Sequence, residues 1–265
     1  DYTHIWVLDD FEDNRKQIEK YEKYPNVRFV KYKSKEYCKD LATVKYLVNN
    51  VSFPSYFLKR EGQVLIDTWH GTPLKNMGFD IPGANISQGN TARNLLSADY
   101  IVSSGPYMTE TAYKNSYKMQ NLYEGTILEE GFPRNDKLFE NNRAEIIRKL
   151  QSYGVNAEAD KKIILYAPTW RGEQYSQPDT DLQDVYKLIQ IIEDSIDTKE
   201  YQVLVKLHQI VYHYLKENQV ELGDAQAKFI PATMDTNEIL SATDVLISDY
   251  SSIFYDFMLT GKPIL

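Results

Sequence analysis

Short apolar runs alternate with amphipathic stretches along the whole chain, and this alternation restricts the fold more than any other feature. Runs rich in Val, Ile and Leu are typical of strands that are buried on both faces, whereas apolar positions spaced by three and four residues indicate helices. A strand, a helix and a further strand make a parallel crossover unit. The alternation therefore predicts an α/β protein whose parallel sheets are covered by helices on both faces.

The pattern gives specific bounds for the expected elements. The strands are predicted at residues 4–8, 27–32, 46–49, 64–68 and 100–103, and then at 162–167, 202–207, 227–230 and 245–248. The helices are predicted at residues 12–24, 34–44, 87–97, 106–117, 141–152, 181–196, 210–217, 236–242 and 251–259.

A chain of 265 residues is long enough for two compact domains. The polar amphipathic segment 141–152 predicts the junction, which gives Rossmann-like domains at 1–145 and 146–265. Two doubly wound domains leave a cleft at the carboxyl ends of their strands, where open α/β sheets bind ligands. The chain begins with Asp1 and stops inside an apparent new strand, so we expect the second domain to be incomplete.

The charge balance limits the class of partner. The chain has 38 acidic and 30 basic side chains, a formal charge of -8 and no block of Lys and Arg. This composition argues against nucleic-acid binding and broad polybasic membrane binding, but it allows a local basic pocket for a phosphorylated ligand.

Cysteine content and apolar run length bear on the compartment. A single cysteine, Cys38, allows no internal disulfide and no CxxC metal cluster, and we interpret it as structural. No apolar run approaches the ~18 residues of a membrane-spanning helix, and no signal peptide is visible. The sequence favours a cytoplasmic location.

Several familiar signatures are missing from the sequence. It contains no GxGxxG, no P-loop and no GxSxG, which argues against the common dinucleotide sites, P-loop ATPases and acyl hydrolases. Asp179 and Asp181 fit the DxD pattern that holds a divalent cation against a diphosphate. They follow Pro178 at the start of a predicted helix, however, where helix capping explains both carboxylates better.

The first of three candidate segments places a histidine at the end of an expected strand. The strand runs into His70, Gly71 and Pro73, so a tight turn holds the imidazole at the edge of the cleft. An imidazole titrates near neutral pH and can take a proton from an alcohol, and glycine permits close approach of a ligand. Lys75 is within reach of a phosphate. A turn histidine with a local hydrogen bond remains an alternative.

The other two segments also follow expected strands. Arg171 offers a planar fork for phosphate, and His208 can donate to a phosphoryl oxygen, although a surface arginine and an edge histidine are common alternatives. Ser251 and Ser252 supply hydroxyls and backbone N–H groups at a helix start, a natural anion site. Capping by Asp249 or Ser251 explains the same residues structurally.

Together these motifs resemble the CDP-glycerol glycerophosphotransferase family, the teichoic-acid primases and polymerases of bacteria with related capsule polymerases. The resemblance covers residues 45–265 and is looser before residue 45. The motifs occur in the family's order: WHGTPLK at 69–75, GFPRND at 131–136, YAPTWR at 166–171, LH at 207–208 and DVLISDYSSIFYDF at 244–257.

The resemblance implies a GT-B fold and metal-independent transfer without a cofactor. The family moves a polyol phosphate from CDP-glycerol or CDP-ribitol to a hydroxyl of a lipid-linked glycan or polyol-phosphate acceptor, and CMP is released. This chemistry implies a peripheral location at the inner face of the bacterial membrane. The domain at 1–145 is then expected on the acceptor side, and the domain at 146–265 is expected to bind the CDP donor.

The resemblance also carries over residue by residue. His70 matches the proposed base and His208 the second essential histidine, near the diphosphate. The positions expected to bind substrate are Lys75, Arg134, Asp136, Thr169, Arg171, Asp249, Ser251 and Ser252.

Two departures from the family pattern stand out. Gln209 replaces the usual proline after the histidine, which we expect to affect the turn that orients His208, and Trp170 replaces the usual phenylalanine. Two other functions remain open at this stage: a nucleotide-sugar glycosyltransferase of the same fold, and a non-catalytic nucleotide-binding module. The choice of glycerol or ribitol, of primase or polymerase, and of oligomeric state is open as well.

Overall fold

The computed structural model describes residues 2–83, 88–140, 142–170 and 182–265. The chain forms two compact units: Asp1–His70 with Asn76–Gly131, and Gly71–Lys75 with Phe132–Leu265. The second unit therefore includes five residues that lie within the first half of the sequence. The predicted domains, 1–145 and 146–265, remain a prediction, and their boundary falls inside a helix of the second unit.

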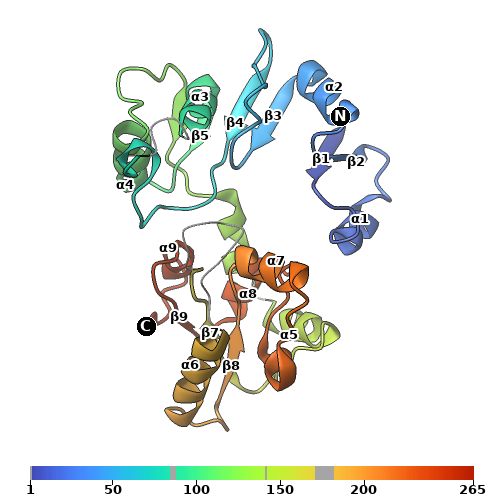
Figure 1. Cartoon of the computed structure of the whole chain (residues 1–265), viewed down its shortest axis with the longest axis vertical. Helices are drawn as coiled ribbons and strands as arrows, with labels where there is room; N and C mark the ends of the chain where they lie inside the picture. Colours follow the sequence, from blue (N-terminus) through green and yellow to red (C-terminus); the bar gives the residue numbers. More distant parts are fainter. Residues whose placement is uncertain (1, 84–87, 141, 171–181) are drawn as a thin grey trace. The chain divides into compact units, whose positions relative to one another are not determined.

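The first unit contains two parallel sheets (Figure 1). Strands β1 and β2 pair with each other, and the other four form a sheet in the order β3-β4-β5-β6. The strands are β1 His4–Leu8, β2 Val27–Lys31, β3 Tyr46–Asn49, β4 Val64–Asp67, β5 Tyr100–Val102 and β6 Thr126–Leu128. The helices are α1 Arg15–Tyr21, α2 Lys35–Thr43, α3 Gly89–Ser97 and α4 Pro106–Met108, with 3₁₀ turn η1 Gly78–Asp80 and π-helix η2 Thr109–Ser116.

Local sequence explains where the helices of this unit begin. The hydroxyl of Ser34 accepts a hydrogen bond from the backbone N–H of Tyr37 at 3.1 Å and so caps α2. Pro106 stands in the first turn of α4, where a missing N–H costs no helical hydrogen bond.

The second unit holds a three-stranded parallel sheet in the order β8-β7-β9. Its strands are β7 Lys162–Tyr166, β8 Tyr201–Val205 and β9 Val245–Ile247. Its helices are α5 Arg143–Ser152, α6 Leu182–Asp194, α7 Gln209–Glu217, α8 Thr236–Ala242 and α9 Ile253–Met258, with 3₁₀ helices η3 Pro133–Phe139 and η4 Gly223–Lys228.

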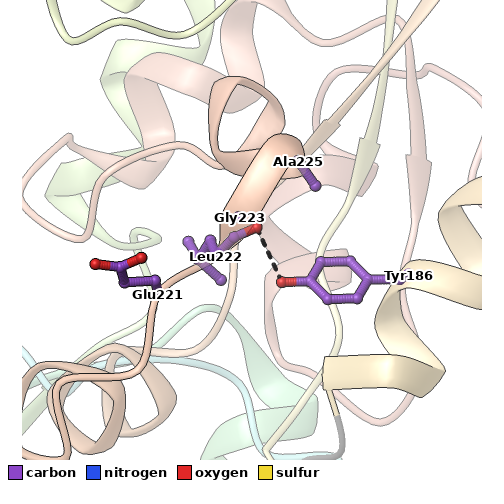
Figure 2. A pocket seen from close by; sticks show the side chains of 5 residues that line it. All are labelled: Tyr186, Glu221, Leu222, Gly223 and Ala225. Carbon is purple, nitrogen blue, oxygen red and sulfur yellow. Dashed lines mark hydrogen bonds between the residues drawn. The ribbon is translucent and has the colours of Figure 1, made fainter.

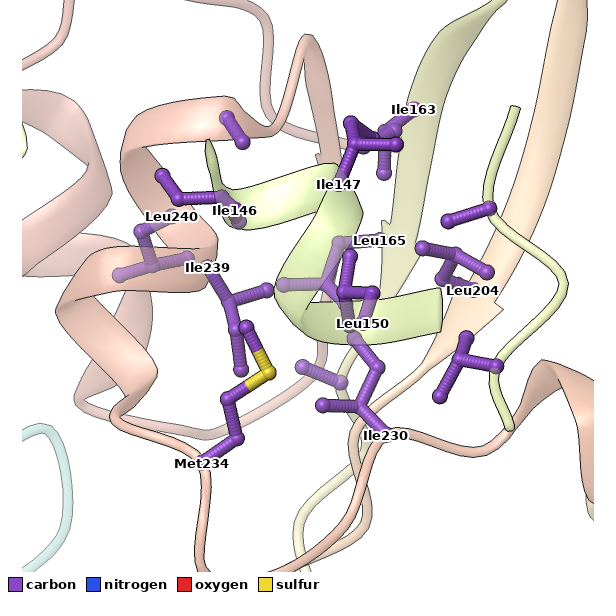
Figure 3. Packing of buried hydrophobic residues seen from close by; sticks show 14 of the residues in the cluster. Ile146, Ile147, Leu150, Ile163, Leu165, Leu204, Ile230, Met234, Ile239 and Leu240 are labelled. Carbon is purple, nitrogen blue, oxygen red and sulfur yellow. The ribbon is translucent and has the colours of Figure 1, made fainter. Parts of the chain in front are cut away.

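Alternate residues of β8 enter two separate apolar clusters, which shows that helices cover both faces of this sheet. Leu204 belongs to a cluster that α5 and α8 complete, and Figure 3 shows Leu150 of α5 in the same cluster. Val203 and Val205 belong to a cluster that α6, α7 and Phe229 complete. Each fully buried aliphatic side chain contributes roughly 1.5–3 kcal/mol, so this double layer fixes the sheet.

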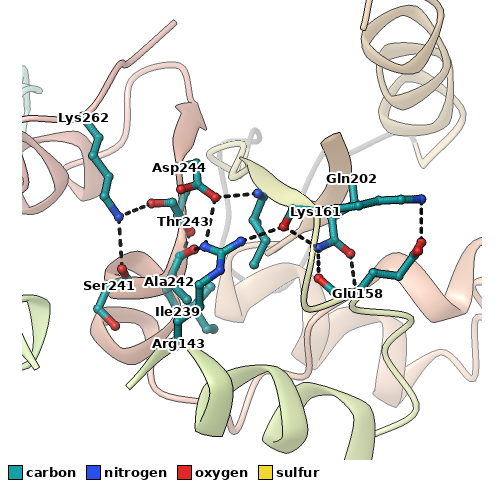
Figure 4. A network of polar contacts seen from close by, with 11 residues as sticks. Arg143, Glu158, Lys161, Gln202, Ile239, Ser241, Ala242, Thr243, Asp244 and Lys262 are labelled. Atoms are coloured by element: carbon teal, nitrogen blue, oxygen red, sulfur yellow. Dashed lines mark hydrogen bonds and ion pairs between the residues drawn. The ribbon is translucent and has the colours of Figure 1, made fainter. Parts of the chain in front are cut away.

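A polar network holds the amino ends of β7 and β9 (Figure 4). Arg143 at the start of α5 donates to Asp244 at 2.9 Å and to the carbonyl of Lys161 at 2.7 Å. The same Asp244 oxygen accepts the backbone N–H of Ile163 at 2.8 Å. Because all strands of the sheet run parallel, this network lies at the edge opposite to the carboxyl ends.

The expected α/β fold with parallel sheets is confirmed, but one predicted strand is wrong. Residues 227–230 do not form a strand: η4 extends to Lys228, and only Phe229 makes an isolated bridge, to Val205. The N–H of Phe229 turns back to Gln226, and Pro231 has no N–H to extend a ladder. Strand β6 was not predicted, because three residues are too few for periodicity. The helix predicted at 106–117 is confirmed, as α4 continued by the π-helix η2.

Candidate functional site

Three predicted site residues follow the three strands of the second unit. Thr169 comes after β7, His208 after β8 and Asp249 after β9. Parallel strands bring their carboxyl ends to one edge, so these side chains share that edge of the sheet. The chain moves from β7 to β8 on one side and later returns to β9 on the other, so a topological switch point lies between β7 and β9.

Thr169 and Asp249 meet at this switch point. One carboxylate oxygen of Asp249 accepts the backbone N–H of Thr169 at 2.8 Å and also its hydroxyl. Ser248 donates from its hydroxyl to the carbonyl of Ala167 at 2.7 Å. The two loops are therefore tied together, and Asp249 holds the shape of this edge with the oxygen that faces Thr169.

His208 caps helix α7, and this contact fixes its tautomer. Its Nδ1 accepts the backbone N–H of Ile210 at 3.3 Å, so the hydrogen of the neutral ring is on Nε2. Burial lowers the pKa of His208 below its ordinary 6.5, and the positive charge of Lys75 lowers it further. Above that pKa His208 is a neutral imidazole that donates from Nε2. Lys75 is exposed and belongs to the same unit as His208.

The departure at Gln209 does not disturb this turn. Gln209 is the first residue of α7, where an N–H has no partner within the helix, and proline is favoured there for the same reason. His208 has φ -64° and ψ 146°, an extended conformation that also suits a residue before proline. The expectation that Gln209 affects the orientation of His208 is therefore not supported by the backbone.

Gly71 makes the closest approach to the loop after β9. A Cβ atom at this position would lie 2.9 Å from the hydroxyl oxygen of Ser252 and 3.8 Å from Nη2 of Arg134. A distance under 3 Å forces a shift, so the absence of a side chain at Gly71 lets this turn pack against Ser252. Two predicted residues, Ser252 and Arg134, thus meet beside the turn that follows His70 in the chain.

Arg134 is already engaged within the protein. Its Nε and Nη2 donate to both oxygens of Asp256 at 2.9–3.2 Å, and the guanidinium lies 4.4 Å from the ring centre of Phe132. Asn135 donates to Asp256 at 3.0 Å and accepts from Asn237 at 2.7 Å, which extends the network into α8. The network anchors η3 to α9 and leaves Nη1 as the part of Arg134 that these bonds do not use.

The remaining predicted residues differ in their surroundings. Ser251 accepts the N–H of Ile253 at 3.4 Å and so begins α9, a helix of only six residues, while Ser252 caps it without a side-chain bond. Asp136 is exposed within η3. Arg171, like Asp179 and Asp181, lies outside the described residues.

His70 belongs to the first unit, at the end of the turn that follows β4. Its Nδ1 lies 2.8 Å from the carbonyl oxygen of Asn50. A carbonyl oxygen only accepts hydrogen bonds, so Nδ1 carries the hydrogen and Nε2 holds the lone pair in the neutral ring. This tautomer is the one that a base acting through Nε2 requires.

Sequence reasoning missed two residues beside His70. Asp67 is 2% exposed, and its carboxylate accepts the backbone N–H of Trp69 at 2.8 Å. Burial raises the pKa of Asp67 to about 7, and the Trp69 N–H opposes this shift. The ring of Trp69 stacks on His70 at 4.4 Å between centres. An acidic residue that ends an apolar strand was the available signal.

Lys206, also missed, organises the edge beside His208. It is 6% exposed, and its ammonium donates to the carbonyls of Pro231, Ala232 and Met234 at 2.6–3.2 Å. Burial lowers the pKa of Lys206 to about 8. All three donors of the ammonium are thus used to hold the loop before α8. A lysine inside an apolar strand pattern could have indicated this role.

An open pocket of about 320 Å³ lies elsewhere in the second unit (Figure 2). Tyr186, Glu221, Leu222, Gly223 and Ala225 line it. The hydroxyl of Tyr186 donates to the carbonyl of Leu222 at 3.1 Å. None of the predicted site residues lines this pocket, so it does not mark the site.

The described residues lack two further features. Within that part of the chain, no helix is both long and apolar enough to cross a bilayer. Nor do the same residues contain a group of three or more His, Cys, Asp and Glu side chains arranged to hold a metal ion.

Comparison with known proteins identifies relatives over the full chain. The model of the family CDP-Glycerol:Poly(glycerophosphate) glycerophosphotransferase matches residues 1–265. The chain is 31% identical to the teichoic acid poly(glycerol phosphate) polymerase of Bacillus spizizenii and 30% identical to the teichoic acid glycerol-phosphate transferase of Staphylococcus aureus. These matches cover 100% and 90% of this chain but 65% and 60% of the relatives, so the chain spans less than two thirds of their lengths.

Relatives named for ribitol phosphate are more distant. The teichoic acid poly(ribitol-phosphate) polymerase of Bacillus spizizenii is 28% identical over 84% of this chain and 35% of its own length.

Solved structures agree with these matches. The wall teichoic acid polymerase TagF superimposes with a TM-score of 0.69 at 28% identity, over 99% of this chain and 69% of that chain. A histidine-to-asparagine variant of TagF soaked with CDPG gives the same TM-score. A putative UDP-N-acetylglucosamine 2-epimerase of Listeria monocytogenes gives 0.55 at 10% identity, over 100% of this chain and 70% of that chain, which shows likeness of fold alone.

Proposed function

Because the chain belongs to the CDP-glycerol:poly(glycerophosphate) glycerophosphotransferase family, we propose that it transfers glycerol phosphate from CDP-glycerol to a hydroxyl of a teichoic-acid acceptor and releases CMP. Four relatives named for glycerol phosphate are 30–34% identical, against 25–28% for four named for ribitol phosphate, which favours the glycerol donor. The observation that carries the proposal is the carboxyl-end edge of the β8-β7-β9 sheet, where Thr169, His208 and Asp249 follow the three strands.

The second unit is the proposed donor side. His208 offers a neutral Nε2–H donor, and Lys75 offers a positive charge. Both are proposed to contact the diphosphate of the donor, His208 by a hydrogen bond and Lys75 by charge attraction. The hydroxyls of Ser251 and Ser252 and the unused Nη1 of Arg134 are further proposed donors, as is Arg171. Asp249 is proposed to act by shaping the loop at Thr169, and Asp136 to contact substrate from the surface.

The first unit is the proposed acceptor side. In a GT-B arrangement the two units face each other across a cleft, and His70 would approach the donor from the opposite wall. The domain bounds 1–145 and 146–265 are part of the same proposal.

The proposed step is an in-line displacement. Nε2 of His70 takes the proton of the acceptor hydroxyl, and the resulting oxygen attacks the phosphorus that carries glycerol. The bond from that phosphorus to the bridging oxygen breaks, and CMP leaves with the electron pair. His208 and Lys75 offset the charge that builds on the phosphates, so that preorganised donors stabilise the transition state.

Metal independence, a lipid-linked acceptor and a peripheral position at the inner face of the membrane complete the proposal. They rest on the family resemblance. A transfer assay that runs at full rate in excess chelator, and that needs a lipid-linked acceptor, would support the first two. Sedimentation of the intact protein with acidic vesicles carrying that acceptor would support the third.

A donor screen tests the function directly. The intact protein is supplied with CDP-glycerol, CDP-ribitol or a UDP-sugar, with chelator and a detergent-solubilised acceptor that ends in glycerol phosphate. We expect CMP release with CDP-glycerol, at least tenfold faster than with CDP-ribitol. Turnover of the UDP-sugar alone would identify a glycosyltransferase, and CDP-glycerol binding without turnover would identify a nucleotide-binding module.

A further inference from the structure

The backbone of Trp69 adopts a conformation that a large side chain avoids. Its φ is +51°, in the left-handed region, where the Cβ atom crowds the backbone of every residue except glycine. Asp67 accepts the N–H of this same residue at 2.8 Å, from two positions earlier. The hydrogen bond from the Trp69 N–H to the Asp67 carboxylate therefore offsets part of the conformational cost of the left-handed backbone at Trp69.

The indole of Trp69 is packed where this turn places it. The side chain is 4% exposed and meets the rings of Tyr113 and Tyr117 edge-on, at 6.3 and 5.6 Å between centres. The indole also stacks on His70, at 4.4 Å between ring centres and an interplanar angle of 28°. The indole thus forms a rigid platform for one face of the imidazole.

The end of β3 holds the imidazole from another direction. The N–H of Thr68 donates to the carbonyl of Asn49 at 2.8 Å, which extends the pairing of β3 and β4 by one residue. Nδ1 of His70 then meets the carbonyl of Asn50 at 2.8 Å. The left-handed residue Trp69 lies between these two contacts with the end of β3.

From these contacts we infer that Asp67 is a positioning residue for His70: its carboxylate fixes the left-handed turn at Trp69, and the turn sets the indole platform and the Nδ1–H tautomer of His70. Burial of a carboxylate costs free energy of folding, and the positioning of His70 explains the presence of Asp67 at the end of β4. The inference rests on the proposed function, in which His70 is the base.

Two substitutions at Asp67 distinguish the effects of its hydrogen-bond acceptor, its volume and its charge. Asp67→Asn keeps an acceptor oxygen without charge, whereas Asp67→Leu keeps the volume and has no acceptor, and both suit a buried site. The control is Gln63→Leu, which also replaces a buried, hydrogen-bonded polar side chain but lies just before the start of β4. Gln63 is 5% exposed and donates to the carbonyls of Leu41 and Val44 at 2.9 and 2.8 Å.

The first readout is the steady-state kinetics of CMP release by the intact protein. We expect Asp67→Leu to lower kcat about 30-fold with the KM for CDP-glycerol changed less than threefold, and Asp67→Asn to recover at least a third of kcat. Gln63→Leu should lower the melting temperature without this loss of kcat. Equal kcat for Asp67→Leu and Gln63→Leu would overturn the inference.

The second readout does not depend on activity. In protein with ¹⁵N-labelled histidine, the ring nitrogen shifts report which nitrogen carries the hydrogen. We expect His70 to be in the Nδ1–H form in the wild type and in Asp67→Asn, and to move toward the Nε2–H form in Asp67→Leu. An unchanged tautomer in a folded Asp67→Leu protein would also overturn the inference. If His70→Ala keeps full turnover, the proposed function fails, whatever the tautomer result.

Discussion

Thr169 donates both its backbone N–H and its hydroxyl to one oxygen of Asp249, and this pair of bonds ties the loop after β7 to the loop after β9. The two loops flank the switch point of the β8-β7-β9 sheet, where a ligand of an open α/β sheet binds. The predicted substrate contacts on these loops thus depend on a link between two residues that are 80 positions apart in sequence.

Breaking this link should weaken donor binding. Asp249→Ala leaves both Thr169 donors without this acceptor, and we expect the KM for CDP-glycerol to rise about tenfold, as for a loss of about 1.4 kcal/mol. Thr169→Val removes only the hydroxyl, so its KM should rise about half as much on a logarithmic scale. If Asp249→Ala and Thr169→Val give the same KM as the wild type, the link does not shape the donor site.

Gln209→Pro should leave the enzyme unchanged. The first position of α7 suits proline, and the extended backbone of His208 is compatible with a following proline. We expect kcat and KM within twofold of the wild type and a melting temperature that is unchanged or slightly raised. A tenfold loss of kcat would show that the amide of Gln209 has a role that the helix geometry does not reveal.

The charge of Lys75 should be visible in the titration of His208. Burial and then the Lys75 charge lower the pKa of His208, so removal of the charge by Lys75→Met should raise that pKa toward its ordinary value. NMR titration of the His208 ring gives the pKa in both proteins. Lys216→Met, on the last turn of α7, is the control and should leave the pKa close to that of the wild type. An equal His208 pKa in Lys75→Met and the wild type would show that the Lys75 charge does not act on His208.

Asp67 should make the stability of the protein depend on pH with a definite sign. Its pKa is raised from 3.8 to about 7 in the folded state, so between these values the folded protein holds a proton that the unfolded chain has lost. The free energy of unfolding therefore falls as the pH rises through this window, and levels off above it.

Asp67→Asn removes that titration. We expect the variant to gain stability relative to the wild type as the pH rises, by about 2 kcal/mol more at pH 8 than at pH 5. Urea denaturation at the two pH values measures the difference. Asp99→Asn serves as a contrast, because the pKa of Asp99 is lowered by Lys59 and the backbone of Leu65, so this variant should lose stability relative to the wild type at neutral pH. A constant difference for Asp67→Asn would show that Asp67 does not titrate in this window.

The sequence predicted the fold well where periodicity was long. The expected strand at 162–167 and β7 agree within one residue. A short continuous run of aliphatic residues between two helical patterns is typical of a parallel strand that is buried on both faces. The strand expected at 227–230 failed because η4 extends to Lys228, although the apolar residues Phe229 and Ile230 are buried, each in a different cluster. Cluster membership depends on tertiary packing, which periodicity does not carry.

The sequence predicted the proposed reacting groups of the candidate site but not the residues that hold them in position. His70 and His208 each follow a strand, which the sequence shows. The bond from Asp67 to Trp69 and the three carbonyl contacts of Lys206 depend on a left-handed turn and on a loop that returns from residues 231–234. Neither conformation has a pattern in the sequence. Capping of α7 by His208, which sets its tautomer, was hidden for the same reason.

CMP release from CDP-glycerol by His70→Ala tests the central claim most directly. General base catalysis contributes roughly 10²–10⁴ in rate, so we predict a loss of at least 100-fold in kcat, with donor affinity by calorimetry within threefold of the wild type. Gln63→Leu should keep its kcat in the same assay. A His70→Ala protein that releases CMP at the wild-type rate would contradict the account.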